Sequence, residues 1–370
     1  MIQGLEQVLE SSGLPGLAEV RQALERLLGG SKVSGRLVEQ QILQPRGQRV
    51  FRLRFTIEEQ NRSVVIKRLK PEIARRNELV AHRWLPAIGL NEAGPPLLGS
   101  VAAQSGECVW HIYDDLGSWE LDPREPDRAK VEAAIALICQ LHLGFARHAL
   151  LGEIRLYGGD LGMNFCQTNV RDALNGLQAW HPQPEQRGVR DRLLARLRKL
   201  EEELPQRIES MSELSGPETL LHGDLWAINV FVMPTAQASS WTARLIDWDH
   251  AAVGPITYDL STFLLRFPAI HREWAFELYR ERMLKSGWKL PSPEQLNLLF
   301  ETHEYARFAN RIIWPAIALT VDGAEWGTAE LAEIEKWFEQ FQPVLPVGSK
   351  PTSARPAEAL LSHQMASACR

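Results

Sequence analysis

The chain has little of several features that would assign it to a specialised class of protein. It contains four cysteines in 370 residues, at Cys108, Cys139, Cys166 and Cys369. Their wide separation excludes a thiol cluster with metal-ligand spacing, and it is typical of reduced thiols rather than of a disulfide framework. No apolar run approaches the roughly 20 residues of a membrane helix, and no early apolar stretch indicates a signal peptide. We therefore expect a cytoplasmic protein without a membrane partner.

A dominant basic cluster is also absent. Lysine and arginine number 41 against 46 aspartates and glutamates, which gives a formal net charge of -5 at pH 7. This balance argues against a nucleic-acid partner, because such proteins concentrate positive charge on one face. The length is sufficient for two lobes with a large buried core.

The first third of the chain has the patterns of a small sheet accompanied by helices. Helical spacing over residues 15–29 ends in a glycine pair, and a second helix is predicted from Pro71 to Ile88, before Gly89. Alternating apolar positions predict strands over residues 37–43, 50–57, 63–69, 97–101 and 108–113. Because short polar turns join the first three strands, we predict an antiparallel meander.

Longer helices are predicted after residue 117, over residues 129–148, 170–180 and 191–204 and again from residue 258 to about 341. The predicted division is an N-terminal helical extension (1–32), a small lobe (33–112), a hinge (113–117), a larger helical lobe (118–345) and a flexible tail (346–370). The expected fold class is therefore α+β, with two lobes.

Two short motifs interrupt the helical part. His222-Gly223-Asp224 is followed by Asn229, and Ile246-Asp247-Trp248-Asp249 comes after the next apolar strand. An Asp, an Asn and a second Asp at this spacing are typical of a kinase catalytic loop and its metal-binding Asp. Such chemistry needs the first Asp at a substrate hydroxyl and the other two groups at Mg²⁺, and a tight loop between short strands brings them together.

With Tyr258-Asp259-Leu260, these motifs resemble the aminoglycoside phosphotransferase and choline kinase-like superfamily over about residues 33–342. The resemblance implies a protein-kinase-like fold with a small antiparallel-sheet N-lobe that binds nucleotide and a larger helical C-lobe. It also implies ATP- and Mg²⁺-dependent transfer of the γ-phosphate to a hydroxyl of a small molecule. The acceptor is left open among an aminoglycoside, choline or ethanolamine, and a sugar or amino-alcohol metabolite.

The resemblance assigns roles to particular residues. Asp224 is expected to accept or orient the proton of the substrate hydroxyl, and Asn229 and Asp247 are expected to hold Mg²⁺. Lys67, at the end of an apolar strand, is expected to reach the α- and β-phosphates and to pair with Glu78 on the next helix. For each residue an ordinary role in a turn or on the surface is the alternative.

Further roles stay open. Asp249 either assists a second metal ion or holds the loop, and His222 is expected to brace the loop. Asp259, by resemblance, ties the catalytic loop to the large lobe, although an acid in the first turn of a helix is common. The adenine edge is expected near Tyr113 and Asp114.

The turn Pro45–Arg49 contains the single glycine Gly47, unlike the glycine-rich loop of protein kinases. Either Arg46, Arg49 and backbone amides contact phosphate there, or the segment is a plain hairpin turn.

The acceptor site is less well marked. The segment between Phe300 and Gln340 contains eight acidic and three basic residues, and Glu301 and Glu304 are candidate ligands for a polycationic aminosugar. The alternative is a solvated helix face. The 12 tryptophans, among them Trp288, Trp314, Trp326 and Trp337, suit either a cage for a quaternary ammonium or ordinary core packing.

Two other functions are compatible with these motifs. A non-catalytic nucleotide-binding regulatory protein of the same fold is one, although it has no need to keep Lys67, Asp224, Asn229 and Asp247 together. An acyl or nucleotidyl transferase on the same scaffold is the other. Protein phosphorylation is disfavoured because no Ala-Pro-Glu signature follows Asp247. The sequence does not predict the oligomeric state.

Overall fold

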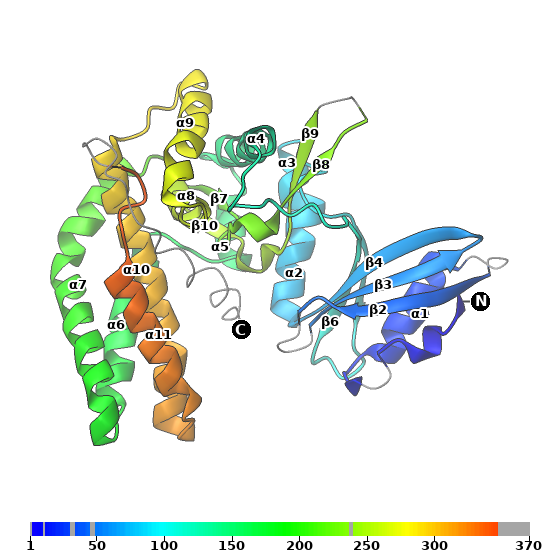
Figure 1. Ribbon diagram of the computed structural model, residues 1–370, viewed down its shortest axis with the longest axis horizontal. Helices are drawn as coiled ribbons and strands as arrows, with labels where there is room; N and C mark the ends of the chain where they lie inside the picture. Colours follow the sequence, from blue (N-terminus) through cyan, green and yellow to red (C-terminus); the bar gives the residue numbers. More distant parts are fainter. Residues whose placement is uncertain (1, 10–11, 30–33, 45–48, 237–239, 347–370) are drawn as a thin grey trace. The chain divides into compact units, whose positions relative to one another are not determined.

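The computed structural model of the chain describes residues 2–9, 12–29, 34–44, 49–236 and 240–346 (Figure 1). These residues form two units. Of these residues, the first unit contains those up to Leu121 and the segment Ile228–Ala251, and the second contains Asp122–Ala227 and residues 252–346. Most of the predicted phosphate-covering turn, with Arg46 and Gly47, lies outside the described residues, and so does the predicted tail from residue 347 onward.

The first unit is built on a six-stranded sheet in the order β1-β2-β3-β4-β6-β5. Strands β1 and β2 are parallel, and the other neighbouring pairs are antiparallel. The strands are β1 (Ile2–Gln3), β2 (Gly35–Ile42), β3 (Val50–Ile57), β4 (Gln60–Leu69), β5 (Leu97–Ala102) and β6 (Val109–Asp114). The predicted strands are confirmed. Strand β1 was not predicted, because two residues are too few to show an alternating pattern.

The helical segments of this unit are η1 (Leu5–Gln7), α1 (Leu17–Leu28), α2 (Pro71–Leu79), η3 (Val80–Trp84), α3 (Leu85–Ala87) and η6 (Trp248–His250). Helices α1 and α2 lie beside the sheet (Figure 1), and the other helical segments are shorter. Val20 and Leu24 of α1 share one buried cluster with Phe51, Leu53 and Phe55 of β3. Because side chains alternate along a strand, this packing leaves the intervening residues of β3 and β4 to the opposite face. The segment predicted as an extension thus belongs to the core of the first unit.

The predicted helix from Pro71 to Ile88 is confirmed but is not regular throughout. It changes from α-helix to π-helix over Val80–Trp84 and returns to α-helix at Leu85. Pro86 lacks a backbone N–H, and its ring would clash with the carbonyl of His82 four residues earlier in a regular helix. The wider π turn avoids that clash.

A β-hairpin from the middle of the sequence completes the first unit. Strands β8 (Val230–Pro234) and β9 (Trp241–Leu245) are antiparallel. The hairpin is joined to the unit through main-chain hydrogen bonds: the Leu121 N–H donates to the Val230 carbonyl at 2.8 Å, and the Leu245 N–H donates to the Ala93 carbonyl at 2.7 Å. This joining makes the first unit discontinuous in sequence, which the predicted contiguous lobes did not include.

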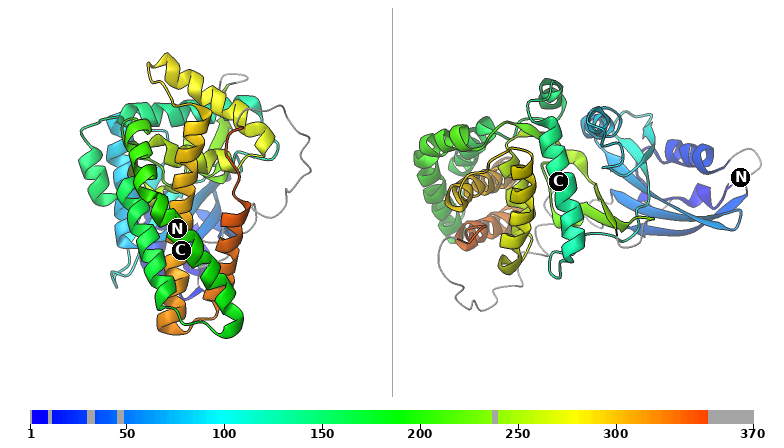
Figure 2. Two further views of the ribbon diagram at one scale, coloured as in Figure 1. Left: turned by 90° about the vertical axis from the view of Figure 1, so that its left-hand side faces the viewer. Right: turned by 90° about the horizontal axis from the view of Figure 1, so that it is seen from above.

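The second unit is mostly helical. Its elements are α4 (Arg128–Phe145), α5 (Leu151–Tyr157), α6 (Met163–Ala179), η4 (Pro184–Gln186), α7 (Arg187–Leu214), β7 (Thr219–Leu221), β10 (Ala252–Gly254), α8 (Ile256–Leu265), α9 (Ala269–Lys285), α10 (Pro293–Ile317), η7 (Ala318–Asp322) and α11 (Trp326–Gln340). The 3-10 turn η5 (Ala227–Asn229) connects the two units in sequence. Helices α6, α7, α10 and α11 run side by side (Figures 1 and 2). A sheet-containing unit and a larger helical unit confirm the predicted α+β class.

Two features of the second unit bear on the site. Strands β7 and β10 pair antiparallel, which brings the start of the first motif beside the chain that leads into α8. Every residue of α8 from Ile256 to Leu264 is buried, so the helix is a central element of its unit. Among the described residues, no helix has both the length and the apolar composition that a bilayer span requires.

Candidate active site

The β8–β9 hairpin brings the second and third residues of the predicted set together. Val230 pairs with Leu245 at the end of the hairpin, and the Ile246 N–H donates to the Asn229 carbonyl at 2.9 Å. Asn229 and Asp247 therefore lie at the same end of the hairpin. Asp247 has φ 65° and ψ 57°, a left-handed conformation that Asp tolerates better than most residues. Backbone strain of this kind is common where a side chain has to be presented at a fixed angle.

Lys67 and Asp247 form an ion pair. The Lys67 Nζ lies 2.5 Å from Asp247 Oδ1 and 2.7 Å from Asp249 Oδ1. Lys67 follows Ile66, which belongs to the buried cluster under α1, so its side chain points to the opposite face of the sheet. Burial alone would lower the pKa of Lys67, but the charges of Asp247 and Asp249 outweigh it and raise the pKa above its ordinary value. The ammonium is charged at any physiological pH.

Asp249 is enclosed more tightly than Asp247. Its side chain is 20% exposed, whereas that of Asp247 is 41% exposed. Asn77 Nδ2 donates to Asp249 Oδ1 at 3.0 Å, and the Arg76 guanidinium donates to the Asp249 backbone carbonyl. Burial raises the pKa of Asp249, while the positive charge of Lys67 acts in the opposite direction. The loop after β9 is thus held by two consecutive residues of α2.

Glu78 has partners other than the one predicted. Its carboxylate accepts a hydrogen bond from Ser100 Oγ at 2.6 Å and lies 3.5 Å from His111 Nε2. Burial lowers the pKa of His111 to about 4, although Glu78 acts against that shift. The expected pair between Lys67 and Glu78 is therefore not the arrangement in this structure, in which Lys67 contacts the two aspartates.

The two residues predicted near the adenine lie at the end of β6. The Tyr113 hydroxyl is 2.9 Å from His111 Nδ1, and burial raises the pKa of Tyr113 above its ordinary value. The backbone N–H of Asp114 donates to the Pro96 carbonyl at 3.0 Å, and the residue is exposed. Tyr113 therefore shares the Lys67 face of the sheet, and Asp114 is the last residue of the strand.

The donor set in the first unit fits a metal ion that arrives with a ligand. Within the described residues, no group of three or more His, Cys, Asp and Glu is arranged to hold a metal. Asn229 and Asp247 offer an amide and a carboxylate oxygen, and Mg²⁺ typically combines one or two such donors with phosphate oxygens and water. These residues suit nucleotide-bound Mg²⁺ better than a permanently bound ion.

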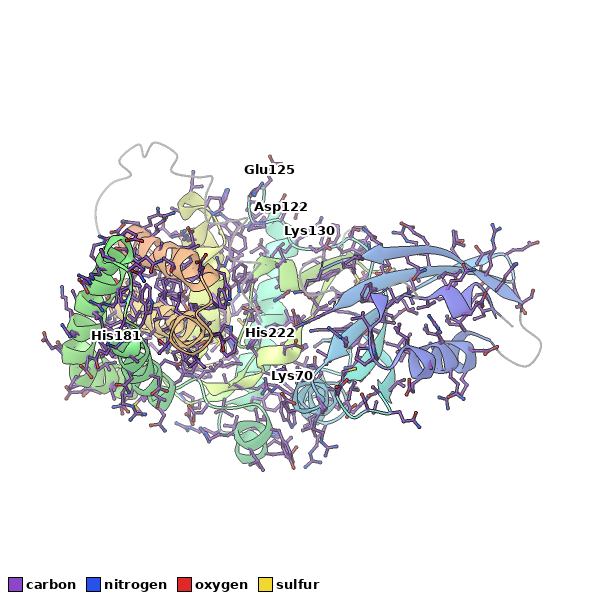
Figure 3. All side chains as sticks on the ribbon, turned by 90° about the horizontal axis from the view of Figure 1, so that it is seen from below. Lys70, Asp122, Glu125, Lys130, His181 and His222 are labelled. Carbon is purple, nitrogen blue, oxygen red and sulfur yellow. The ribbon has the colours of Figure 1, made fainter. Side chains whose placement is uncertain are left out.

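The first motif belongs to the second unit, where Asp259 holds its backbone. The His222 N–H donates to Asp259 Oδ2 at 2.7 Å, and the Gly223 N–H donates to Asp259 Oδ1 at 2.9 Å. His222, labelled in Figure 3, is fully buried. Gly223 has φ 80°, a left-handed conformation in which a residue without Cβ is unstrained. Both N–H groups are thereby aimed at one carboxylate just before Asp224.

Asp259 is itself fixed by buried partners. His142 Nε2 lies 3.5 Å from Asp259 Oδ2, and His142 Nδ1 lies 2.8 Å from the Tyr279 hydroxyl. Burial would raise the pKa of Asp259, but the hydrogen bond from His142 and the positive potential of both histidines lower it below its ordinary value. The expectation that Asp259 ties the loop to the helical unit agrees with these contacts.

Arg266 stacks on Trp226, two residues after Asp224, and interacts electrostatically with Asp224. The Trp226 N–H donates to the Asp224 carbonyl at 2.8 Å, and the Arg266 guanidinium carbon lies 3.3 Å above the centre of the Trp226 ring. Burial lowers the pKa of Arg266 to about 10, while the charges of Glu304 and Asp224 act against that shift. A cation therefore accompanies the proposed catalytic carboxylate.

Glu301 and Glu304, the two predicted acceptor ligands, are already paired with arginines. Arg207 Nη2 lies 2.8 Å from Glu301 Oε2. Arg307 pairs with Glu304, which also accepts a hydrogen bond from Ser261 Oγ at 2.8 Å. Glu304 is only 2% exposed. These contacts describe internal ion pairs and give no support to an open acidic pocket.

The tryptophans have mixed environments. Trp337 is buried and packs against Phe308, with ring centres 5.7 Å apart. Trp314 and Trp326 are 62% and 49% exposed. Core packing thus accounts for Trp337 and does not account for the other two.

Sequence reasoning missed several residues that the structure places at these positions. Asn77 and Arg76 precede Glu78 on the same helix, but neither is a residue type that a kinase motif would select. His142 and Arg266 likewise have no motif of their own. Only the fold brings them to Asp249, Asp259 and Trp226.

With this geometry established, comparison with known proteins places the chain in a family. The model of the phosphotransferase enzyme family matches residues 54–289. This match covers more than half of the chain, and the chain belongs to that family. The predicted resemblance and the prediction of a kinase-type transferase are thereby confirmed. No curated protein sequence gives a significant match.

Solved structures with the same fold are distant in sequence. An ethanolamine kinase from Plasmodium vivax has a TM-score of 0.55 at 12% identity, over 89% of this chain and 92% of its own. A spectinomycin phosphotransferase in complex with ADP and spectinomycin has a TM-score of 0.53 at 14% identity, over 84% and 91%. The GDP complex of aminoglycoside 2′-phosphotransferase-IIIa has a TM-score of 0.51 at 13% identity, over 86% and 98%. At these identities the likeness confirms the kinase-like fold and nothing finer.

Proposed function

We propose that this phosphotransferase uses ATP and Mg²⁺ to transfer the γ-phosphate to a hydroxyl group of a small molecule. The observation that carries the proposal is the ion pair between Lys67 and Asp247, at 2.5 Å, with Asn229 at the same end of the hairpin. Binding of a nucleoside triphosphate with its metal ion requires a cation at the phosphates and oxygen donors for the metal, and these residues supply both. Structures of similar fold with ADP and GDP support the use of a nucleotide.

In this proposal the first unit binds the nucleotide. Lys67 exchanges part of its contact with the aspartates for the α- and β-phosphates, and Asn229 and Asp247 supply metal ligands. Mg²⁺, when bound, neutralises charge on the phosphate oxygens. The adenine edge is assigned to the backbone near Tyr113 and Asp114, at the end of β6.

Asp224 is the proposed catalytic residue. Its carboxylate would accept or orient the proton of the attacking hydroxyl. Phosphoryl transfer requires little covalent help, so the gain comes from holding the nucleophile and from compensating charge. Asp259 supports this role, because the two N–H groups it accepts fix the backbone immediately before Asp224.

The class of acceptor is proposed from the names of the similar structures. They act on spectinomycin, on ethanolamine and on aminoglycosides, which are all small polar molecules with hydroxyl groups. A polycationic acceptor finds no support in Glu301 and Glu304, because both carboxylates are neutralised by arginines. A small alcohol with fewer positive charges, such as an amino alcohol or a sugar, suits the second unit better.

The test is transfer of ³²P from the γ-phosphate of ATP to a panel of ethanolamine, choline, homoserine, hexoses, ketosamines and aminoglycosides. Wild type and Asp224→Asn are assayed in parallel, with Asp191→Asn on the exposed surface of α7 as the matched control. We expect label on one class of acceptor with wild type and the control, and at least about 10²-fold less with Asp224→Asn. In a parallel assay with ATP labelled at the α-phosphate, label on an acceptor would identify nucleotidyl transfer. Nucleotide binding without transfer of either label would favour the regulatory alternative.

A further inference from the structure

Asp249 receives contacts from two elements of the first unit. Lys67 of β4 lies 2.7 Å from its Oδ1, and Asn77 of α2 donates to the same oxygen at 3.0 Å. Arg76, the preceding residue of α2, donates to its backbone carbonyl. Side chain and main chain of one residue thus connect a strand, a helix and the loop after β9.

Helix α2 is connected to Lys67 through Asp249, which contacts both Asn77 and Lys67. Glu78, the acid of α2 that was expected to pair with Lys67, is engaged with Ser100 and lies near His111. Asn77 carries no charge and cannot form an ion pair with Lys67. Its contact with the shared oxygen of Asp249 is what relates the position of α2 to that of the Lys67 ammonium.

The local backbone separates the two aspartates. Trp248 between them is 3% exposed, and its Nε1 donates to the Leu245 carbonyl at 2.9 Å. This anchor fixes the short 3-10 turn after Asp247. Asp249 is consequently the more enclosed of the two, at 20% against 41% exposure. Both aspartates contact Lys67, and what distinguishes Asp249 is the hydrogen bond that its Oδ1 accepts from Asn77 together with its lower exposure, which both disfavour a metal ligand.

We infer that Asp249 is a positioning residue that couples α2 to Lys67 and Asp247, and that it is not a ligand of the metal. Asp249 has the role that was expected of Glu78 on α2, which is to link this helix to Lys67, because it accepts hydrogen bonds from Lys67 and from Asn77 of α2. The inference rests on the proposed nucleotide site. It predicts that Asp249 acts through Asn77, and that its loss disturbs the position of Lys67 rather than the affinity for Mg²⁺.

A double-mutant cycle tests the coupling. Asp249→Ala and Asn77→Ala are each expected to lower kcat about tenfold, as loss of a supporting contact commonly does. The double variant is expected to match the worse single variant within about twofold, because both substitutions remove one shared contact. Glu72→Ala, exposed in the first turn of α2, is the control and should leave kcat unchanged. Additive losses in the double variant would overturn the coupling.

A metal titration separates positioning from ligation. The concentration of Mg²⁺ that half-saturates ADP binding is measured by calorimetry for wild type, Asp249→Asn and Asp247→Asn. We expect Asp249→Asn to change it by less than about twofold, because the isosteric amide oxygen still accepts from Lys67 and Asn77, and Asp247→Asn to raise it about tenfold or more. An equal rise in both variants would show that Asp249 ligates the metal.

A third measurement does not depend on nucleotide. Hydrogen exchange of α2 is compared between nucleotide-free wild type and Asp249→Ala, with the more conservative Asp249→Asn as a check on folding. Faster exchange confined to α2 and the loop after β9 supports the coupling, and unchanged exchange contradicts it. If wild type fails to bind nucleotide at all, the proposed function fails, while the exchange of α2 still decides whether Asp249 couples these elements.

Discussion

The two groups of candidate polar residues, one in each unit, are held in opposite ways. In the first unit, Lys67 forms ion pairs with Asp247 and Asp249, and the Asp247 side chain stays 41% exposed. In the second unit, Asp259 is completely buried, and its oxygens accept mainly from the backbone N–H groups of His222 and Gly223. Of the first group, the carboxylate of Asp247, which is proposed to bind a ligand, is the part most accessible to solvent, whereas the carboxylate of Asp259, which holds a loop, is enclosed.

The difference follows from the cost of moving each group. The ion pair between Lys67 and Asp247 has one partly exposed partner, so water competes for the Asp247 carboxylate and the pair opens at a lower cost than a fully buried one. A buried carboxylate with satisfied hydrogen bonds is expensive to disturb, because removing its partners leaves an uncompensated charge. A partly exposed ion pair suits a site that binds a ligand, and a buried carboxylate suits a residue that fixes the backbone of a loop. Substitutions in the two units should separate these roles.

The largest expected effect is that of Asp224→Asn, the test of chemistry in the second unit. We expect kcat to fall by about 10²-fold or more, because the general base and part of the positioning are lost. The affinity for ADP, measured by calorimetry, should stay within about threefold of wild type. Asp191→Asn serves as the matched control. Turnover close to that of wild type would remove Asp224 from the proposed role.

Asp259→Asn should affect stability where Asp247→Asn does not. Loss of a buried carboxylate that accepts two N–H groups should lower the free energy of unfolding by about 3 kcal/mol, and the accessible Asp247 should contribute less than about 1 kcal/mol. Urea unfolding of both variants measures the contrast. The pKa of Asp259 is lowered in the folded state, so its contribution is present above about pH 4, the ordinary Asp value, and is lost as the pH falls further. Equal losses in the two variants would contradict the distinction drawn here.

Lys67→Ala should weaken the nucleotide site without unfolding the protein. We expect kcat/KM for ATP to fall by about 10- to 100-fold, since a charge-assisted contact to phosphate is lost. Lys70→Ala is the matched control, because Lys70 is exposed just beyond the end of β4 and is labelled in Figure 3. A loss for Lys70→Ala with none for Lys67→Ala would move the phosphate contact to the neighbouring lysine.

The smallest predicted effect concerns the pH dependence of stability. Burial, with a smaller contribution from Arg307, lowers the pKa of His303 to about 3, whereas an unfolded histidine titrates near 6.5. Between these values only the unfolded chain binds the proton, so the free energy of unfolding falls as the pH decreases, by up to about 1.4 kcal/mol per pH unit. We expect His303→Gln to remove about 1–2 kcal/mol of the change between pH 6.5 and 5.

Urea unfolding at a series of pH values measures this slope, and His181→Gln, at an exposed residue, is the control. An unchanged slope in His303→Gln would show that His303 is not kept neutral by burial. The slope is compared rather than the absolute stability, because the substitution itself disturbs the contact with Thr257 at 2.9 Å.

Much of the fold could be predicted because its signals are local. The strand Val50–Ile57 alternates apolar and polar residues, and the helix that begins at Pro71 ends before Gly89 as its flanking residues indicate. The π-helical segment of that helix follows from Pro86, a signal that was present but not used. Strand β1 had no local signal, because two residues are too few for a period.

The roles predicted for the candidate site residues stay predictions, and some of the contacts expected for them differ in the structure. By itself the sequence determined which groups are available, because Asp224, Asn229 and Asp247 occur in the order that is typical of a kinase catalytic loop and its metal-binding Asp. Only the tertiary structure decided the partners of the charges. Lys67 contacts Asp249 rather than Glu78, and Glu304 faces Arg307 rather than an open pocket. Electrostatic pairing depends on distance and burial in space, and neither quantity can be read from positions along the chain.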